Sequence, residues 1–244
     1  MSDLNDVRFF ATAPHTCSYL EGKTATTLFA DPDVQIADED YQTLTLLGFR
    51  RSGKYYYRPQ CNGCQACISV RVPVADFVWS RRFKKTLKTN TGVVAEWRLP
   101  YIDDEVYALY SRYINLRHPD GDMHPPSQEQ FRTFLMIEGP NTRFLCFRDA
   151  EGTLLAVSVV DVLAGHGLSA IYTFFEPEQP KRSLGRLGIL TQVLEAQRLK
   201  LPYVYLGYWI RECEKMSYKT DYQPIELLNG RVWTRQAPGG RRPA

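Results

Sequence analysis

The second half of the chain carries the clearest alternation of apolar and polar positions. Between residues 103 and 116, apolar or aromatic side chains recur every three to four positions, which predicts an amphipathic helix. Acidic residues at 103–105 suit the first turn of that helix. Ser127 followed by Gln130 fits a capping box and predicts a second helix that runs to about Ile137.

Further along, the period changes from that of a helix to that of strands. Three strand-like runs cover 143–148, 154–163 and 168–175, with turn residues between them. A second amphipathic pattern over 184–199 predicts a helix that ends before Pro202, and a strand over 203–207 follows.

The first half of the chain is less regular. Turn and helix-start chemistry occurs at 31–33 and 37–40. Residues 50–54 are typical of a tight turn and Tyr55–Tyr57 of a strand that ends at Pro59, so we expect a hairpin here. The alternation over Ile68–Val74 predicts a half-buried strand.

The order helix, helix, three antiparallel strands, helix, strand resembles the core of the GNAT acyltransferases. We therefore expect an α+β fold: a GNAT-like core with a mixed sheet flanked by helices, and a smaller N-terminal α/β region packed on it. The expected domains are 1–98, with a cysteine loop and a basic segment, 99–235 for the transferase core, and a mobile tail at 236–244.

Composition excludes several classes of protein. Hydrophobic residues make up 44% and charged residues 23% of the 244 residues, which excludes a disordered or fibrous chain. No run of about 18 apolar residues occurs, so we expect no transmembrane helix and no membrane partner. The first ten residues lack the apolar segment of a secretory signal. We therefore expect a cytoplasmic protein with reduced thiols.

Charge is distributed in alternating blocks. Net charge is −6 over residues 1–40, +9 over 41–100, −7 over 101–180 and +7 over 181–244, within a total of +3. Such blocks suit a basic face for a phosphate-bearing partner, although charge spread evenly over a solvated surface gives the same totals.

Cysteines are the first candidates for special chemistry. Cys61, Cys64 and Cys67 form C-x2-C-x2-C, with Cys17 upstream. Thiolates at this spacing can hold Zn²⁺ or an iron–sulfur cluster, and they can equally be small buried apolar residues in a tight turn. Cys146, inside an apolar strand, is expected in the core.

A second candidate is a basic segment. Five cations, Arg81, Arg82, Lys84, Lys85 and Lys88, stand close to Trp79 and Phe83. Cations suit the phosphates of a nucleic acid and aromatic rings free to stack suit its bases, while the simpler interpretation is a solvated helix face.

The segment before the last predicted helix is a third candidate. Arg182 and Gly185 fit the acetyl-CoA loop [QR]-x-x-G-x-[GA], which holds a pyrophosphate at a helix N-terminus. Leu187 departs from it, and we expect that side chain to crowd a pyrophosphate. A plain helix start with flexible glycines is the alternative.

Several separated motifs together resemble one family, the aminoacyl-tRNA–protein transferases, and within it the short bacterial members that transfer leucine. These motifs are Cys17–Leu20, Gly48–Gly53 with Tyr57–Pro59, Cys61–Val74, Arg117–Met123, Ser183–Gly185, and Tyr205–Ile210 through Lys215–Lys219 to Pro224. The resemblance implies transfer of leucine from leucyl-tRNA to the N-terminal amine of proteins that begin with Asp or Glu, which marks them for degradation by the N-end rule.

The resemblance also bears on cofactors. No cofactor is required for the reaction, although N-terminal cysteines of eukaryotic relatives have been linked to an iron–sulfur cluster. Leu20 stands here where those relatives have their second thiol. A zinc ion or cluster at Cys17, Cys61, Cys64 and Cys67 is therefore one expectation and an unmetallated loop is the other.

We assign roles from the chemistry of aminolysis of an ester. Lys215, Tyr218 and Lys219 are the candidate catalytic residues. The candidate substrate-binding residues are Cys17, Tyr19, Arg50, Tyr57, Arg117 and His118. The five cations from Arg81 to Lys88 are the candidate tRNA-binding residues, because the donor is a polyanion.

Three other functions stay open. One is the same reaction with arginyl-tRNA as the donor, since the sequence does not identify the side chain that the donor pocket accepts. Another is an acetyl-CoA-dependent N-acyltransferase, against which Leu187 and the basic segment count. The third is an RNA-binding module whose cysteines hold a structural metal. The sequence does not determine the oligomeric state.

Overall fold

A computed structural model describes residues 7–137 and 141–236. The chain forms two compact units whose segments alternate along the sequence. Unit 1 holds the described residues up to Val78, Leu163–Gly167, and those from Pro202 onward, and unit 2 holds Trp79–Val162 and Leu168–Leu201. Along the sequence, each unit is made of several separate segments, whereas the expected division has a single boundary near residue 98. Residues 237–244 of the expected tail lie outside the described residues.

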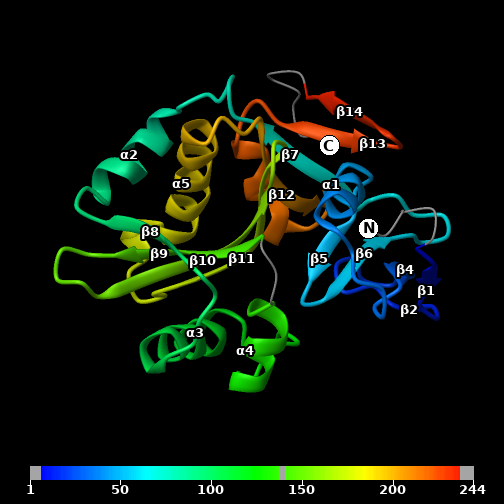
Figure 1. The fold of residues 1–244 in the computed structure, drawn as a ribbon, viewed down its shortest axis with the longest axis horizontal. Coiled ribbons are helices and arrows are strands. Elements are labelled where there is room, and N and C mark those ends of the chain that lie inside the picture. Colours follow the sequence, from blue (N-terminus) through cyan, green and yellow to red (C-terminus); the bar gives the residue numbers. More distant parts are fainter. Residues whose placement is uncertain (1–6, 138–140, 237–244) are drawn as a thin grey trace. The chain divides into compact units, whose positions relative to one another are not determined.

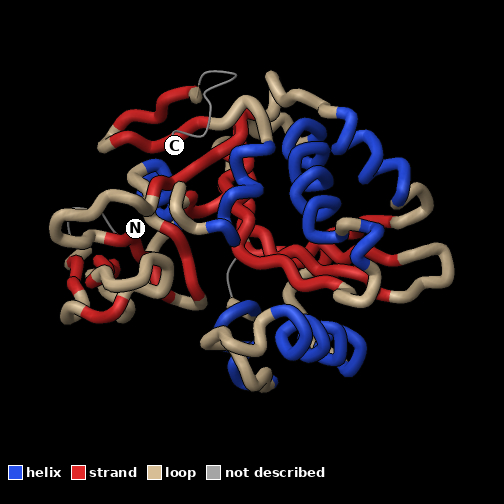
Figure 2. Tube along the Cα trace, turned by 180° about the vertical axis from the view of Figure 1, so that it is seen from behind, coloured by secondary structure: helices blue, strands red, loops and turns tan. Residues whose placement is uncertain are grey.

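Unit 2 is a layer of strands with helices on both faces (Figures 1 and 2). Its strands follow the order β11-β10-β9-β8. Figure 1 shows α2 and α5 on one face and α3 and α4 on the other. Its elements are α2 (Arg81–Thr89), β8 (Val94–Arg98), α3 (Asp104–Arg117), α4 (Gln128–Leu135), β9 (Thr142–Arg148), β10 (Leu154–Leu163), β11 (Gly167–Phe175), η1 (Pro180–Arg182) and α5 (Leu184–Arg198).

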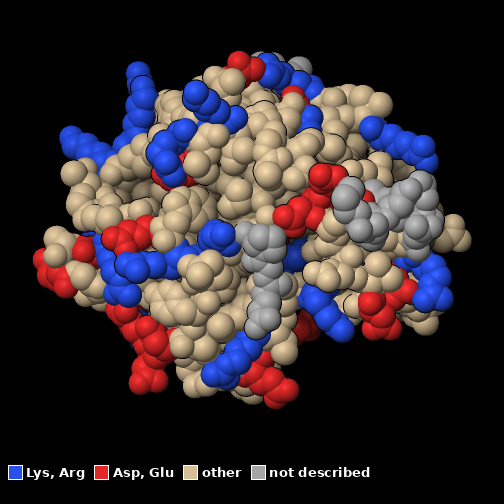
Figure 3. Space-filling view, in the orientation of Figure 1, with Lys and Arg blue, Asp and Glu red and all other residues tan. Residues whose placement is uncertain are grey.

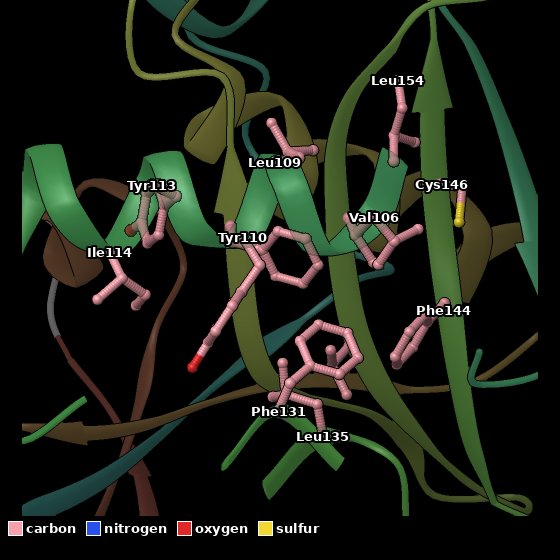
Figure 4. Close-up of a cluster of buried hydrophobic side chains, with 13 residues drawn as sticks. Val106, Leu109, Tyr110, Tyr113, Ile114, Phe131, Leu135, Phe144, Cys146 and Leu154 are labelled. Atoms are coloured by element: carbon pink, nitrogen blue, oxygen red, sulfur yellow. The ribbon is translucent and has the colours of Figure 1, made fainter. Parts of the chain in front are cut away.

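Side chains on both faces of β9 are buried, which explains the apolar run Phe144–Phe147 in this strand. Phe144 and Cys146 point toward α3 and α4, where they meet Tyr110 and Phe131 in an aromatic cluster (Figure 4). The Tyr110 and Phe131 rings are 5.1 Å apart and edge to face. Cys146 is 3% exposed, so its expected place in the core is confirmed.

The opposite face of β9 holds a second cluster. Leu145 and Phe147 meet Leu184 and Leu187 of α5 there. Burial on both faces fixes the register of the strand, because a slip by one residue would exchange the two sets of side chains.

The helices of unit 2 begin where their caps predict. The Asp103 carboxylate accepts a hydrogen bond from the Val106 amide at 2.8 Å, and the Ser127 hydroxyl accepts one from the Gln130 amide at 3.1 Å. Helices α3, α4 and α5 and strands β9, β10 and β11 agree with the predicted elements to within one or two residues.

Unit 1 is built mainly from short strands. They form the sheets β1-β4-β6-β5 and β2-β3 and the strand series β14-β13-β7-β12. Its elements are β1 (Phe9–Ala11), β2 (His15–Thr16), β3 (Thr24–Ala25), β4 (Thr27–Ala30), α1 (Asp38–Leu46), β5 (Arg50–Ser52), β6 (Tyr55–Pro59), β7 (Ile68–Pro73), β12 (Tyr203–Trp209), η2 (Glu214–Asp221), β13 (Glu226–Asn229) and β14 (Val232–Arg235).

Two expectations for unit 1 are corrected by its strand pairing. Residues 50–52 form strand β5 and not a turn, so the predicted hairpin turns at Gly53 and Lys54 alone. β7 is buried along most of its length and not half-buried, and it is an interior strand that pairs with β12 on one side and β13 on the other. The polar side chain of Arg71 in this strand is satisfied by Glu226, whose Oε2 lies 2.7 Å from Arg71 Nε.

An irregularity in β12 shapes the site described next. The register of β12 against β7 shifts between Tyr205 and Gly207, as in a β-bulge. Gly207 has a φ of +80°, a conformation that glycine adopts without a steric penalty. The chain beyond the bulge is thereby redirected.

In the described part of the chain, no helix combines the length and the apolarity that a bilayer crossing requires.

Candidate functional site

Two buried cations of unit 1 converge on the backbone at Gly207. Arg50 comes from β5 and Lys219 from η2, and each is only 7% exposed. A β-carbon built on Gly207 would lie 3.6 Å from Arg50 Nε and 3.7 Å from Lys219 Nζ. The absent side chain at 207 therefore leaves a methyl-sized space between the two charges. We call these residues the Arg50–Lys219 pair.

Lys219 is anchored by the strand that carries the bulge. Its ammonium donates a hydrogen bond to the backbone carbonyl of Tyr208. Burial and, to a smaller extent, the positive charge of Arg50 lower the pKa of Lys219 to about 7, while Cys213 acts in the opposite direction. The amine therefore changes its charge near neutral pH, as groups in functional sites often do.

Tyrosine hydroxyls line the same part of unit 1. The hydroxyl oxygen of Tyr208 lies 2.8 Å from the Gly48 carbonyl oxygen and 3.1 Å from that of Tyr57. The rings of Tyr57 and Tyr208 meet edge to face at 6.1 Å. Burial raises the pKa of both phenols, and of Tyr19 to about 12. All three hydroxyls are therefore protonated at neutral pH, and the single hydrogen of the Tyr208 hydroxyl is donated to these backbone carbonyls.

Three thiols lie near the hydroxyl of Tyr19. Its pKa is raised first by burial, then by Tyr57 and by Cys67, Cys213 and Cys17, which places these groups near one another. Tyr19 as a whole is 42% exposed. The expected substrate-binding residues Cys17, Tyr19, Arg50 and Tyr57 thus belong to one neighbourhood of unit 1.

The cysteine loop does not form a ready metal site. All six cysteines are free, and burial together with neighbouring thiols raises the pKa of Cys67 to about 12. Among the described residues, no group of three or more His, Cys, Asp or Glu side chains is placed to hold a metal ion. A metal at Cys17, Cys61, Cys64 and Cys67 gains no support from this placement and stays a prediction.

A pocket of about 510 Å³ lies beside this neighbourhood in unit 1. Cysteine-loop residues form one part of its wall, and Tyr208, Gly48 and Ser69 form another. The pocket therefore lies between the cysteine loop and β12, the strand that contains Gly207 and Tyr208.

Helix α2 carries the basic segment in unit 2. Lys and Arg side chains gather over α2 in the upper left of Figure 3. Arg81, Arg82, Lys84, Lys85 and Lys88 are all exposed. We call this set the basic face of α2. It is the surface that the sequence predicts for tRNA phosphates.

The aromatic part of that prediction is wrong for one ring. Phe83 is 1% exposed, because it belongs to the buried side of α2 together with Thr86. It is therefore unavailable for stacking on a base, and its spacing among the cations reflects helix amphipathicity. Trp79 is half-buried.

The side chain of Leu187, near the start of α5, does not lie where we expected it to crowd a pyrophosphate. Leu187 is 5% exposed and packs against Leu155 and Phe147 in the core, so it does not crowd the helix N-terminus. A β-carbon on Gly188 would lie 2.7 Å from Ser158 Oγ, and one on Gly185 would lie 3.0 Å from the Phe175 ring. These glycines allow α5 to pack closely on the strands.

The remaining candidates are dispersed. Tyr218 is 46% exposed, with its ring 5.9 Å from Lys219 Nζ, and Lys215 is exposed on η2. Arg117 and His118 belong to unit 2, at the end of α3. His118 Nε2 lies 3.2 Å from the hydroxyl of Tyr113, which is a local structural contact.

The structure adds three residues that reasoning from the sequence did not select. Gly207 and Tyr208 stood inside the quoted Tyr205–Ile210 motif without an assigned role, and Cys213 follows it closely. A glycine between aromatic strand residues was the available signal, because glycine within a strand often marks a bulge or a close approach.

Comparisons with known proteins give one consistent result. A family model described as arginine-tRNA-protein transferase, C terminus, matches residues 105–229, and the N-terminus model of the same enzymes matches residues 15–85. The chain is 53% identical over 237 residues to the aspartate/glutamate leucyltransferase of Alcanivorax borkumensis, covering 97% of each chain. It is 54% identical over 235 residues to that of Chromohalobacter salexigens, covering 96% of this chain and 94% of the relative.

Solved structures give only a distant likeness. The structure of L-PGS from Bacillus licheniformis aligns with a TM-score of 0.45 at 12% identity, over 84% of this chain and 69% of the other.

Proposed function

This chain belongs to the arginine-tRNA-protein transferase family, and on that premise we propose that it transfers leucine from leucyl-tRNA to the N-terminal amine of proteins that begin with Asp or Glu. The observation that carries the proposal is the identity of more than half of all aligned positions with aspartate/glutamate leucyltransferases along nearly the whole chain. The enzyme is an aminoacyl-tRNA–protein transferase.

The reaction is the aminolysis of an activated ester. The α-amine of the acceptor attacks the ester carbonyl, the new amide C–N bond forms, and the bond to the ribose oxygen of the tRNA breaks. The amine loses a proton and the ribose oxygen gains one. Positioning of amine and ester supplies much of the rate, and each hydrogen-bond donor to the oxyanion contributes about 3–4 kcal/mol.

We place this chemistry at the Arg50–Lys219 pair and the surrounding tyrosines. The protonated hydroxyl of Tyr57 and the buried cations are groups that bind negative or polar atoms of a substrate, while Tyr208 donates its one hydroxyl hydrogen to the backbone. We also keep four other residues in the same reaction. They are Lys215 and Tyr218 on η2, and Cys17 and Tyr19 beside the cysteine loop. Arg117 and His118 stay assigned to substrate binding.

The donor binds through the basic face of α2. Five exposed cations along about two turns of a helix match an extended phosphate backbone better than one small anion. Sequence-independent binding of this kind holds the tRNA, while the amino acid and the acceptor are selected elsewhere.

Fold, location and cofactor complete the proposal. The described chain order α3, α4, β9, β10, β11, α5, β12 supports a GNAT-like core. The reaction takes place in the cytoplasm, where aminoacyl-tRNA is made, and its product is marked for degradation. Transfer needs no cofactor, because the tRNA ester is already activated.

A transfer assay tests the donor and the acceptor together. The purified chain is incubated with labelled leucyl-tRNA or arginyl-tRNA and with peptides that begin with Asp, Glu, Arg or Ala. We expect leucine on the Asp and Glu peptides alone. Arginine transfer would keep the reaction and overturn the donor, and no transfer by folded protein would overturn the proposal.

A further inference from the structure

The pocket of about 510 Å³ beside the cysteine loop carries charge of one sign. Its volume lies within the range of about 300–1,000 Å³ that is typical of small-molecule sites. Among the described residues that line it, Arg58 alone is an Arg, Lys, Asp or Glu. Burial and neighbouring thiols raise the pKa of Cys67, another lining residue, to about 12, so that thiol is uncharged at neutral pH. The pocket is therefore suited to a ligand with a negative charge.

Arg58 is held in place without being neutralised. It is half-buried in β6, with its guanidinium 5.1 Å from the centre of the Phe49 ring, and its Nη1 donates a hydrogen bond to the Leu47 carbonyl at 3.3 Å. A guanidinium has five N–H groups, so in the described residues four of them have no partner. Stacking on a ring occupies one face of the guanidinium and leaves its edges, where the N–H groups point, available to a ligand.

Two other arginines of unit 1 are neutralised by carboxylates. Arg8 pairs with Asp31 at 2.9 Å, and Arg71 pairs with Glu226 at 2.7 Å. In the described part of the chain, no carboxylate pairs with Arg58. The charge of Arg58 therefore faces a pocket without a counterion from the protein.

The remaining lining residues suit a peptide better than a tRNA phosphate. Gln60 and Gln65 contribute amide groups that both donate and accept hydrogen bonds, as a peptide backbone requires. Leu47 and Ile68 contribute apolar surface for the methylene groups of a side chain. A phosphate backbone instead needs several cations in a row, as on the basic face of α2.

Tyr208 belongs both to the wall of this pocket and to the residues among which we place the reaction. Its carbonyl accepts the hydrogen bond from Lys219. An acceptor terminus in the pocket would therefore lie against β12, the strand on which Lys219 is anchored.

We infer that this pocket binds the N-terminal residue of the acceptor and that Arg58 binds its side-chain carboxylate. A guanidinium and a carboxylate form two parallel N–H···O hydrogen bonds, which Asp and Glu can both accept. Asn and Gln have the same shapes but leave the charge of Arg58 without a counterion. This assignment rests on the proposed function for the nature of the acceptor, and it adds the residue that selects the acidic side chain.

Binding of peptides in the absence of tRNA tests the pocket directly. Peptides labelled at their C-terminal end, which differ only in Asp or Asn at the first position, are titrated with the full chain, and fluorescence anisotropy gives each Kd. Arg58→Met removes the charge, and Arg58→Lys keeps the charge but loses the two-pronged geometry. Lys54→Met is the control for charge removal, because Lys54 is exposed in the β5–β6 turn.

A second pair of variants tests the location. Ala66 lines the pocket and is half-buried, so Ala66→Leu places a larger side chain in it. Ala75 is exposed in unit 1 and is not a lining residue, so Ala75→Leu is the matched control. Circular dichroism and thermal unfolding establish that each variant is folded.

We expect the wild type to prefer the Asp peptide and Arg58→Met to reduce that preference about tenfold or more, with a smaller reduction in Arg58→Lys. Ala66→Leu should weaken binding of both peptides, and both controls should match the wild type. Equal or absent affinity of the wild type for the two peptides would overturn the inference. So would an undiminished preference in folded Arg58→Met, or unchanged binding by folded Ala66→Leu.

Two further measurements separate this inference from its alternatives. Adenosine 5′-monophosphate in excess should not displace the Asp peptide, and displacement together with equal affinity for Asp and Asn would assign the pocket to the 3′ end of the tRNA. In the transfer assay, Asp binding that depends on Arg58 without leucine transfer would support the pocket and reject leucyl transfer. Leucine transfer whose Asp preference survives in Arg58→Met would reject the pocket assignment and support the function.

Discussion

Replacing Lys219 by Met is expected to stabilise the folded chain at low pH while removing activity. The ammonium of Lys219 loses its hydration on folding and lies beside Arg50, which lowers its pKa from 10.5 to about 7. Each unit of such a difference corresponds to about 1.4 kcal/mol, so burying the charged amine costs at most about 5 kcal/mol at pH 6.

The dependence on pH follows from which state holds the proton. Between pH 7 and 10.5 the unfolded chain keeps the Lys219 proton and the folded chain has lost it, so the unfolding free energy of the wild type rises with pH in this range. At pH 9 the remaining cost is about 2 kcal/mol. The advantage of Lys219→Met over the wild type should therefore be about 3 kcal/mol larger at pH 6 than at pH 9.

Urea unfolding at pH 6 and pH 9 measures this difference. The hydrogen bond from Lys219 to the Tyr208 carbonyl is lost in the variant, at a cost of about 1–3 kcal/mol. This cost affects both pH values and cancels in the comparison. Lys54→Met, an exposed control, should show no such change. An advantage of Lys219→Met that is equal at the two pH values would refute the reasoning.

Other expectations concern the tRNA surface and the cysteine loop. Reversing Lys84 and Lys85 to Glu should weaken tRNA binding and reduce the slope of log Kd against log salt by about 1–2, and an unchanged slope, equal to that of Lys200→Glu, would contradict a role in phosphate binding. Phe83→Ala should lower the unfolding free energy by about 3–5 kcal/mol without changing that slope, and a variant of native stability that binds tRNA poorly would instead restore the stacking role. Treatment with a chelator should leave transfer and the unfolding midpoint unchanged, with less than one zinc or iron per chain by elemental analysis, and unfolding on chelation would show a structural metal.

Periodicity was sufficient to predict the helices and strands of unit 2. Asp103 and Ser127 cap their helices through side-chain oxygens, and the long apolar runs of β9 and β10 are buried on both faces. These are local signals, so sequence reasoning captures them. Strands of two to four residues, such as β2 and β14, are too short to show a period, and they were not predicted.

The site was only partly predictable for a different reason. Arg50 and Lys219 were both candidates, but nothing local shows that they meet, since 169 positions separate them. The role of Gly207 depends on the approach of these two side chains to its backbone, so it could not be recognised from the sequence. Phe83 and Leu187 were misjudged because their orientation depends on which side of a helix faces the strands, and a short motif does not specify that.

The pairing of β7 has a consequence for synthesis on the ribosome. Its partner β12 lies about 130 residues further along, and β13 follows later still. At a translation rate of about 5–20 residues per second, on the order of ten seconds pass between the synthesis of β7 and the synthesis of both partner strands. Throughout that interval Val70 and Val72 belong to a strand with two open edges, the kind of segment that invites pairing with other nascent chains. A chaperone that holds the first eighty residues until the last forty emerge would therefore raise the yield of active enzyme.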